Sequence, residues 1–282
     1  MSDRPWLGAY PEGVPADIDP SQYPSLVALM QEAFTKHANK VAYSFMGKEL
    51  TFAQVDAQSR VFAAYLQSLG LVRGDRVALM MPNIPQYPVA AAGVLRAGFV
   101  LVNVNPLYTA RELEHQLKDS GAKAIIIIEN FAKTLQDGKN GSAIEHIVLC
   151  AMGDELGCIK GSIVNFVVRT VKKMVPPFSL PGAVRFNHAL SKGRKAKFDE
   201  PVLKPDDMAL LQYTGGTTGV SKGAVLLHRN IIANVLQSEA WNDPVMQKVP
   251  AGEQPTSVCA LPLYHIFAFT VNMMLSMRTG GK

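Results

Sequence analysis

The sequence predicts an α/β protein whose sheets are mostly parallel and flanked by helices. Segments with helical periodicity alternate along the chain with short apolar, β-branched runs, a pattern typical of parallel sheets. The clearest run is 122–128, which is apolar almost throughout, as expected for a strand covered by helices on both faces. Two capping boxes, Thr51 with Gln54 and Thr109 with Glu112, mark the starts of helices.

Each further element is predicted from a local pattern. Helices are expected where apolar residues recur at helical spacing or a cap precedes them, at 25–36, 51–69, 85–97, 109–121, 163–175, 229–241 and 266–277. Strands are expected where short apolar runs are bounded by turn residues, at 41–46, 49–51, 76–81, 99–104, 122–128, 146–150, 208–213, 224–227 and 257–261. Residues 1–24 predict an extended arm, and 191–205 predict a polar surface excursion.

Composition and charge narrow the class of protein. The chain has 282 residues, of which 48% are hydrophobic, so it can bury a large core. Its net charge of +5 suits anionic ligands but is too small to indicate nucleic acid as a partner. The three cysteines lack metal-ligand spacing and suggest a reducing compartment. No segment reaches the roughly 18 uninterrupted apolar residues of a spanning helix, which favours a cytoplasmic protein or one bound to a membrane surface.

A glycine-rich segment at 211–223 interrupts the apolar pattern. It reads Leu-Gln-Tyr-Thr-Gly-Gly-Thr-Thr-Gly-Val-Ser-Lys-Gly and connects two predicted strands. Glycines let a ligand approach the backbone closely, and successive N–H groups in such a turn bind anions. Because Lys222 adds a positive charge, the segment predicts a phosphate-binding loop.

Three other types of loop share some features of this segment. A P-loop requires Lys before Ser or Thr and a helix afterwards, whereas Lys222 follows Ser221. A dinucleotide fingerprint opens a helix, but this segment runs from strand to strand. An ordinary polar hairpin loop is the remaining alternative. The length of the segment, and the crowding of Thr214, Thr217, Thr218 and Lys222 around its glycines, favour phosphate binding.

The predicted helix at 163–175 is amphipathic and basic. One arc of its helical wheel carries apolar residues, namely Ile163, Val164, Val167, Val168, Val171, Met174 and Val175. The other side carries Asn165, Arg169, Lys172 and Lys173, with Phe166 as an apolar exception. Two interpretations stay open. The commoner arrangement is a surface helix with its apolar stripe on the core. The alternative is peripheral contact with an anionic membrane, at the inner face of the cell membrane.

Residues 213–224, Tyr-Thr-Gly-Gly-Thr-Thr-Gly-Val-Ser-Lys-Gly-Ala, closely resemble the AMP-binding signature of the acyl-adenylate-forming superfamily. Over nearly its whole length the chain is similar to bacterial long-chain fatty-acid–CoA ligases, notably at 82–88, 104–109, 113–117 and 261–267. The resemblance implies part of the large N-terminal domain of that fold. In this division, 1–24 is an arm, 25–205 an α/β region with the basic helix, and 206–282 the phosphate-loop region.

The resemblance also implies an activity. A fatty-acid carboxylate would attack the α-phosphorus of ATP to give acyl-AMP, and coenzyme A would then displace AMP. Mg²⁺ is expected on the phosphate oxygens. The residues implied in nucleotide binding are Tyr213, Thr214, Gly215, Gly216, Thr217, Thr218, Gly219 and Lys222. Among them, Lys222 would offset charge on the leaving pyrophosphate, and Thr214 would contact Mg²⁺.

A second group implied by the resemblance lines the junction of the nucleotide and acyl sites. It comprises His265, Ile266 and Phe269, and the candidates with a catalytic role are Lys222 and His265. For His265 the residues alone favour a hydrogen-bonded structural histidine, because no carboxylate or second histidine is tied to it by spacing.

The chain departs from the family beyond Lys282, where relatives continue with a Tyr-Gly-x-Thr-Glu segment, a ribose-binding Asp and a C-terminal domain carrying a Lys. We therefore expect a partial ligase that is inactive alone, and the apolar surface of a truncated sheet leaves self-association as an oligomer open. The alternatives are a medium-chain or aromatic acid–CoA ligase, or a non-catalytic nucleotide- or lipid-binding fragment. A Tyr-Gly-x-Thr-Glu segment in frame downstream favours an enzyme, and a stop codon favours the fragment.

Overall fold

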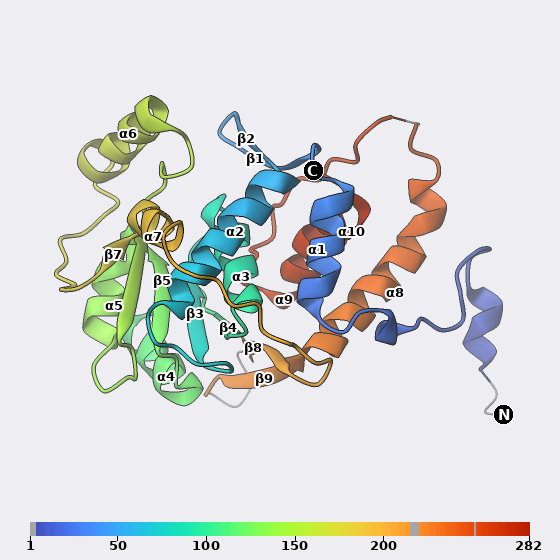
Figure 1. The fold of residues 1–282 in the computed structure, drawn as a ribbon, viewed down its shortest axis with the longest axis horizontal. Coiled ribbons are helices and arrows are strands. Elements are labelled where there is room, and N and C mark those ends of the chain that lie inside the picture. Colours follow the sequence, from blue (N-terminus) through green and yellow to red (C-terminus); the bar gives the residue numbers. More distant parts are fainter. Residues whose placement is uncertain (1–3, 215–219, 251) are drawn as a thin grey trace.

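The computed structural model describes residues 4–214, 220–250 and 252–282. Its main sheet has seven strands in the order β7-β6-β5-β3-β4-β8-β9 (Figure 1). The strands are β3 (Arg76–Met80), β4 (Val100–Asn103), β5 (Ala124–Ile128), β6 (His146–Cys150), β7 (Val184–Arg185), β8 (Met208–Thr214) and β9 (Lys222–Leu227). All neighbours pair in parallel except β8 and β9, which are antiparallel. The predicted mostly parallel α/β class is confirmed.

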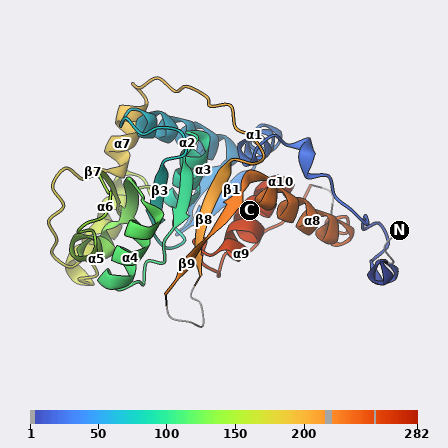
Figure 2. The same cartoon turned by 90° about the horizontal axis from the view of Figure 1, so that it is seen from below.

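Helices cover both faces of this sheet (Figure 2). On one face lie α2 (Phe52–Gln67), α3 (Gln86–Arg96) and α7 (Phe186–Gly193), and on the other lie α4 (Ala110–Ser120) and α5 (Ala132–Gly138). Alternate strand residues belong to two separate cores: Leu79 packs in the core of the α2–α3 face, whereas Met80 packs with Leu113 and Leu117 of α4. Burial on both faces explains the continuous apolar run of β5.

The remaining elements extend the α2–α3 face. They are α1 (Leu26–Lys36), the hairpin of β1 (Val41–Phe45) and β2 (Lys48–Thr51), α8 (His228–Met246), and a continuous helical segment formed by α9 (Ile266–Ala268), the π-helix η5 (Phe269–Leu275) and α10 (Ser276–Thr279). Both predicted capping boxes form: the backbone N–H of Gln54 donates to Thr51 Oγ1 at 3.2 Å, and that of Glu112 donates to Thr109 Oγ1 at 3.3 Å.

Several predicted elements need correction. No strand forms at 257–261: Ser257 N–H bonds to Lys282 O at 2.9 Å, the other backbone bond is the local one from Ala260 N–H to Val258 O, and Val258 is exposed. The arm at 1–24 contains two short 3₁₀ helices, η1 (Pro5–Ala9) and η2 (Pro20–Gln22). The sequence patterns also missed η3 (Glu129–Phe131), α5, β7 and α7, which are short elements fixed by tertiary packing.

The predicted helix at 163–175 forms with other bounds and another orientation. It comprises α6 (Cys158–Phe166) and a π-helical turn, η4 (Val167–Val171). Gly161 is its one buried residue, and no side chain of the helix belongs to either core among the described residues. The interpretation that its apolar stripe packs on the core is therefore wrong. The reason is a close backbone contact at Gly161, which turns the polar side of the helix toward the body.

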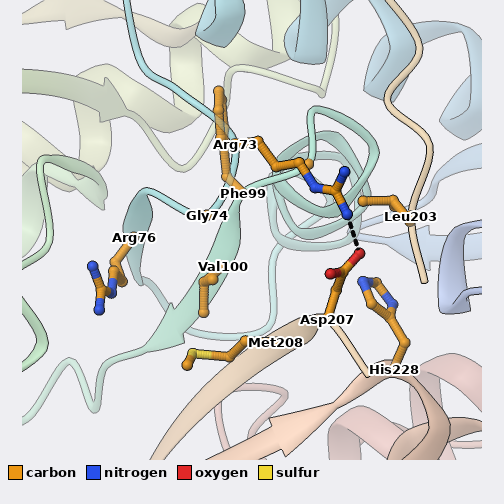
Figure 3. A pocket seen from close by; sticks show the side chains of 10 residues that line it. Arg73, Gly74, Arg76, Phe99, Val100, Leu203, Asp207, Met208 and His228 are labelled. Atoms are coloured by element: carbon orange, nitrogen blue, oxygen red, sulfur yellow. Dashed lines mark hydrogen bonds and ion pairs between the residues drawn. The ribbon is translucent and has the colours of Figure 1, made fainter. Parts of the chain in front are cut away.

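A cavity of about 180 Å³ lies at the amino ends of β3, β4 and β8 (Figure 3). Arg73 and Asp207 form an ion pair there, and His228 lies beside them (Figure 3). The backbone N–H of Leu26 donates to His228 Nδ1 at 3.1 Å, which ties the start of α1 to the start of α8. Burial lowers the pKa of His228 to about 4. This imidazole is therefore neutral in the folded protein near neutral pH.

We expect the stability of the fold to decrease on acidification through His228. Between pH 6.5 and 4 the unfolded chain takes up a proton on this histidine and the folded chain does not, so the free energy of unfolding falls as the pH falls. The full effect is on the order of 3 kcal/mol. Urea unfolding at pH 7 and pH 4.5 measures it. His228→Asn, whose Oδ1 can take the place of Nδ1 as the acceptor for Leu26, should flatten this dependence, while His188→Asn at an exposed position should not. An equal fall in the free energy of unfolding between pH 7 and pH 4.5 for all three proteins would show that His228 is not the group responsible.

A second prediction concerns the packing of α7 on α2. A Cβ added at Gly193 would lie 2.1 Å from the carbonyl oxygen of Val61, a backbone atom that cannot move aside cheaply. Gly193→Ala should lower the free energy of unfolding by about 2–4 kcal/mol. Gly8→Ala is the control, because nothing lies within 4 Å of its added Cβ. A similar urea midpoint for both variants would show that the α2–α7 contact is not tight.

Candidate functional site

The antiparallel pair β8–β9 forms the base of the predicted phosphate loop. Thr214 ends β8 and Lys222 begins β9, and the two residues are register partners across the pair. Both side chains are exposed. The predicted loop residues Gly215, Gly216, Thr217, Thr218 and Gly219 lie outside the described residues. The structure therefore brings together the two ends of the predicted loop, one with a hydroxyl and one with an ammonium group.

This base lies at the carboxyl edge of the parallel sheet. Because β8 runs parallel to β4, and β4 to β3, their carboxyl ends meet at one edge of the sheet (Figures 1 and 2). Ligands of open α/β sheets bind in the crevice beyond the carboxyl ends of the strands. Thr214 and Lys222 therefore occupy the expected edge, opposite the cavity at Arg73 and His228.

Helix α4 contacts both ends of the loop. On the β9 side, His115 Nε2 lies 3.0 Å from the carbonyl oxygen of Ser221. On the β8 side, the hydroxyl of Tyr213 donates to Asp119 Oδ2 at 2.5 Å. Burial, together with this hydrogen bond, raises the pKa of Tyr213, so the hydroxyl stays protonated and acts as a donor. The sequence analysis did not identify Asp119, whose spacing from His115 places it near the same face of the helix.

Glycine at position 223 makes room for the ring of Tyr213. The two residues are register partners, and a Cβ added at Gly223 would lie 3.0 Å from both Cε2 and Cζ of the tyrosine. The ring can therefore lie across the β9 backbone and still reach Asp119. In this way Gly223 and Tyr213 together set the geometry at the base of the loop.

His265 lies in a turn that is linked to the same strand. It is the N-cap of α9, and the backbone N–H of Phe267 donates to His265 Nδ1 at 3.3 Å. The amide Nε2 of Gln212, the neighbour of Tyr213 in β8, donates to the carbonyl oxygen of Tyr264 at 3.2 Å. The structural role that the residues alone favoured for His265 is thus present, and Nε2 is left as the protonated nitrogen.

The other two acyl-side candidates differ in exposure. Ile266 is partly buried against the core of the α2–α3 face, and Phe269 is fully buried within it. An open, mostly apolar cavity of about 360 Å³ lies nearby, between β1 and the turn after β3. Its lining includes Tyr43, Ile84, Cys259 and Leu263, but neither Ile266 nor Phe269. A substrate role for those two residues stays a prediction.

Two side-chain amides, the partly buried Asn83 and the buried Asn103, support the turn that carries His265, and sequence reasoning did not identify them. Asn83 accepts from the backbone N–H of Leu263 at 2.8 Å and donates to the carbonyl oxygens of Cys259 and Leu261, each at 2.8 Å. Asn103, at the end of β4, lies 2.7 Å from the hydroxyl of Tyr87 and donates to Gln212 at 3.4 Å. The available signal was a polar residue at or just after the carboxyl end of an apolar parallel strand.

Comparison with known proteins gives the chain its family. The family described as AMP-binding enzyme matches residues 30–282. The chain is 52% identical over 278 residues to a long-chain-fatty-acid–CoA ligase of Escherichia coli, covering 98% of this chain and 49% of the relative. It is 34% identical over 282 residues to the Bacillus subtilis enzyme of the same name, covering 99% and 49%. The chain therefore spans about half the length of the curated relatives that it matches.

A solved structure supports the fold. The crystal structure of a long-chain-fatty-acid–CoA ligase from Archaeoglobus fulgidus aligns with a TM-score of 0.71 at 22% sequence identity, covering 97% of this chain and 48% of that one. The shared fold, the family match over most of the chain and the close bacterial relatives agree, and the chain belongs to the AMP-binding enzyme family.

Proposed function

We propose that this chain supplies the phosphate-binding part of an enzyme that activates a long-chain fatty acid to acyl-AMP and then to acyl-CoA with ATP and coenzyme A. The observation that carries the proposal is the pairing of Thr214 with Lys222 at the carboxyl edge of the sheet, in a chain 52% identical to such ligases. Because the chain spans about half of those relatives, the reaction is assigned to the protein of which these residues form part.

The proposed chemistry depends on charge neutralisation and positioning. A carboxylate is a weak nucleophile and approaches a polyanion, so binding groups that offset negative charge lower the barrier most. Lys222 is exposed at the start of β9 and can offset charge on the leaving pyrophosphate. The backbone of Gly215, Gly216 and Gly219 and the hydroxyls of Thr217 and Thr218 are proposed to hold the β- and γ-phosphates.

The described residues fit a nucleotide that brings its own Mg²⁺. In the part of the chain that the structure describes, no group of three His, Cys, Asp or Glu side chains could hold a metal ion. Mg²⁺ commonly keeps several waters and binds through substrate phosphates with few protein ligands, where it neutralises phosphate charge. The exposed hydroxyl of Thr214 is the proposed protein contact.

His265 is proposed to contact the substrate where the nucleotide meets the acyl chain. Its Nδ1 is occupied by the N–H of Phe267, so its Nε2–H can donate to a phosphate or carboxylate oxygen. Ile266 and Phe269 are proposed to line the acyl side of the same junction. The link from Gln212 to Tyr264 would hold this turn at a fixed distance from the end of β8.

A medium-chain or aromatic acid is the second candidate substrate. The chain is also 29% identical over 235 residues to 4-coumarate–CoA ligase 4 of Arabidopsis thaliana, which covers 83% of this chain and 37% of that relative. Exchange of ATP with labelled pyrophosphate, measured on the product of the whole gene with acids of increasing chain length, separates the candidates. Exchange driven best by long acyl chains is expected, and no exchange with any acid would overturn the proposal in favour of a non-catalytic fragment.

We also propose peripheral contact with an anionic membrane through 163–175, at the inner face of the cell membrane. A long-chain fatty acid partitions into bilayers, so an enzyme that meets its substrate there gains local concentration. Among the described helices, none is long and apolar enough to cross a membrane.

Lys222→Ala should weaken nucleotide binding and leave folding intact. Loss of one charge-assisted contact should raise the Kd for Mg²⁺–ATP by roughly 10- to 100-fold. Because the side chain is exposed, the free energy of unfolding should change by less than about 0.5 kcal/mol. Titration calorimetry and urea unfolding of the 282-residue chain measure both quantities. The control variant is Lys197→Ala. Lys197 is exposed, pairs with Asp199 and lies outside the predicted phosphate loop. Equal affinity for all three proteins would remove Lys222 from the site.

Gly223→Ala, one residue from Lys222, should lower the stability of the fold, which Lys222→Ala should leave unchanged. The added methyl group displaces the ring of Tyr213, so the free energy of unfolding should fall by about 1–3 kcal/mol. Val225→Ala in the same strand is the control, because that side chain is 51% exposed. If Gly223→Ala is no less stable than Val225→Ala, the proposed contact between Tyr213 and the β9 backbone is not tight.

A further inference from the structure

Helix α6 is attached to the body of the protein by its polar side. A Cβ added at Gly161 would lie 2.3 Å from the carbonyl oxygen of Gly153, so the helix backbone rests directly on the turn after β6. One turn further, Asn165 Oδ1 accepts from the backbone N–H of Gly153 at 2.7 Å. Glycine at both positions is what permits this approach.

An ion pair between the half-exposed Arg169 and the buried Glu129 completes the attachment in η4. Arg169 donates to both carboxylate oxygens of Glu129, from Nε at 2.7 Å and from Nη2 at 3.0 Å. Glu129 is only 1% exposed and also accepts from Arg185 at 2.5 Å. Removing one arginine from such a buried carboxylate is costly, so the pair fixes the rotation of the helix about its own axis.

The opposite face of the helix is apolar and faces solvent. Ile159, Ile163 and Phe166 are 81%, 58% and 59% exposed, and their spacing places them on one face. Val171, at the end of η4, and Met174, beyond it, are 61% and 54% exposed and add to the exposed apolar surface. Figure 1 shows α6 at the margin of the molecule. We call these five residues the α6 outer face. An amphipathic surface helix normally buries its apolar side, and here the arrangement is reversed.

The stretch of chain that carries the α6 outer face has only basic charged residues. Residues 156–198 contain no Asp or Glu. Lys160 bonds to the carbonyl oxygen of Met46 and Arg169 is engaged by Glu129, whereas Lys172 and Lys173 are exposed next to Val171 and Met174. An exposed apolar face bordered by free lysines is complementary to an anionic lipid surface. Two copies of the chain meeting symmetrically on this face would bring their lysines together, which disfavours a dimer.

We propose that the α6 outer face inserts into the interface of an anionic phospholipid bilayer, with Lys172 and Lys173 on the lipid headgroups. The inference rests on the proposed peripheral membrane contact and assigns it to a face, with Gly161, Asn165 and Arg169 as its attachment. Both views place α6 apart from β9, whose first residue is Lys222, so a protein docked through α6 leaves β9 away from the lipid surface (Figures 1 and 2).

Flotation of the 282-residue chain with vesicles tests the apolar part of the proposal. The chain should float with vesicles that contain phosphatidylglycerol and phosphatidylcholine, without any nucleotide or acyl substrate. The triple variant Ile159→Gln, Ile163→Gln, Phe166→Gln should bind at least ~100-fold more weakly, because the inserted apolar area is lost. The matched control replaces three apolar residues exposed elsewhere, Val72→Gln, Leu107→Gln and Val202→Gln, and should bind as the parent chain does.

Lys172 and Lys173 should strengthen vesicle binding only when the lipid surface is anionic. Lys172→Gln with Lys173→Gln should weaken binding to phosphatidylglycerol vesicles by about 25-fold, roughly fivefold for each charge. The residual binding to pure phosphatidylcholine vesicles should not change. Lys195→Gln with Lys197→Gln, exposed but outside the helix, is the control pair and should have at most a small effect.

Three results would overturn the proposal: no flotation of the parent chain, equal loss in the α6 and control triple variants, or no dependence on phosphatidylglycerol. If light scattering without lipid shows a dimer that the α6 triple variant abolishes, a second copy is the occupant and the lipid assignment is wrong. Because Mg²⁺–ATP affinity is measured separately, failure of lipid binding leaves the phosphate-loop assignment intact, and failure of ATP binding leaves the α6 result intact.

Discussion

The parallel pairing of β8 with β4 is the contact on which the candidate site depends. It joins the later part of the chain to the sheet made by residues 76–128, with Leu101 opposite Leu210 and Asn103 opposite Gln212. The side chains of Asn103 and Gln212 are both buried and bond to each other at 3.4 Å. A slip of one residue would send Gln212 to the other face of the sheet and leave Asn103 without this partner. The position of Thr214 at the carboxyl edge follows from this register.

The same register links two features that lie far apart in sequence. Through Gln212, strand β8 holds the carbonyl oxygen of Tyr264, and through Tyr213 it reaches Asp119 on α4. The hydroxyl of Tyr87 lies 2.8 Å from the carbonyl oxygen of Leu263, which ties α3 to the same turn. One strand therefore positions the base of the loop and the turn of His265 together. Such coupling suits a reaction in which charge neutralisation and substrate orientation must coincide.

Much of the fold could be predicted from local sequence patterns, because the folded structure gives these segments the burial and the caps that their sequences favour. The continuous apolar run of β5, the capping boxes at Thr51 and Thr109, and Gly121 at the end of α4 each have a local physical cause that the structure retains. The strand predicted at 257–261 failed because strand formation requires a neighbour, and among the described residues only Lys282 offers a non-local backbone bond there. The phosphate-binding role of 213–223 stays a prediction. The bond from Tyr213 to Asp119, and the support that Asn83 gives to the turn of His265, required knowledge of the tertiary fold.

Helix α6 shows where periodicity stops being informative. The pattern separates Ile163 from Asn165 and Arg169, but it placed Phe166 with the polar residues, whereas the structure exposes Phe166 together with Ile163. It also cannot say which side meets the protein. That choice is made by Glu129 and Gly153, which lie 40 and 12 residues from their partners Arg169 and Asn165. A buried carboxylate needs a cation, and backbone contact needs glycine, so these demands outweigh the tendency of apolar side chains to be buried.

The orientation of α6, with Gly161 and Arg169 against the protein, also determines which substitutions the helix can tolerate during evolution. On the attached side, backbone contact excludes a larger residue at Gly161, and lysine cannot reproduce the bidentate bond of Arg169. Few substitutions are therefore tolerated there. At Ile159 or Phe166 nothing in the described protein constrains shape, and one large apolar residue can replace another. Related chains that keep this helix should therefore hold its polar side nearly fixed and vary its apolar side freely in shape, which is the reverse of an ordinary surface helix.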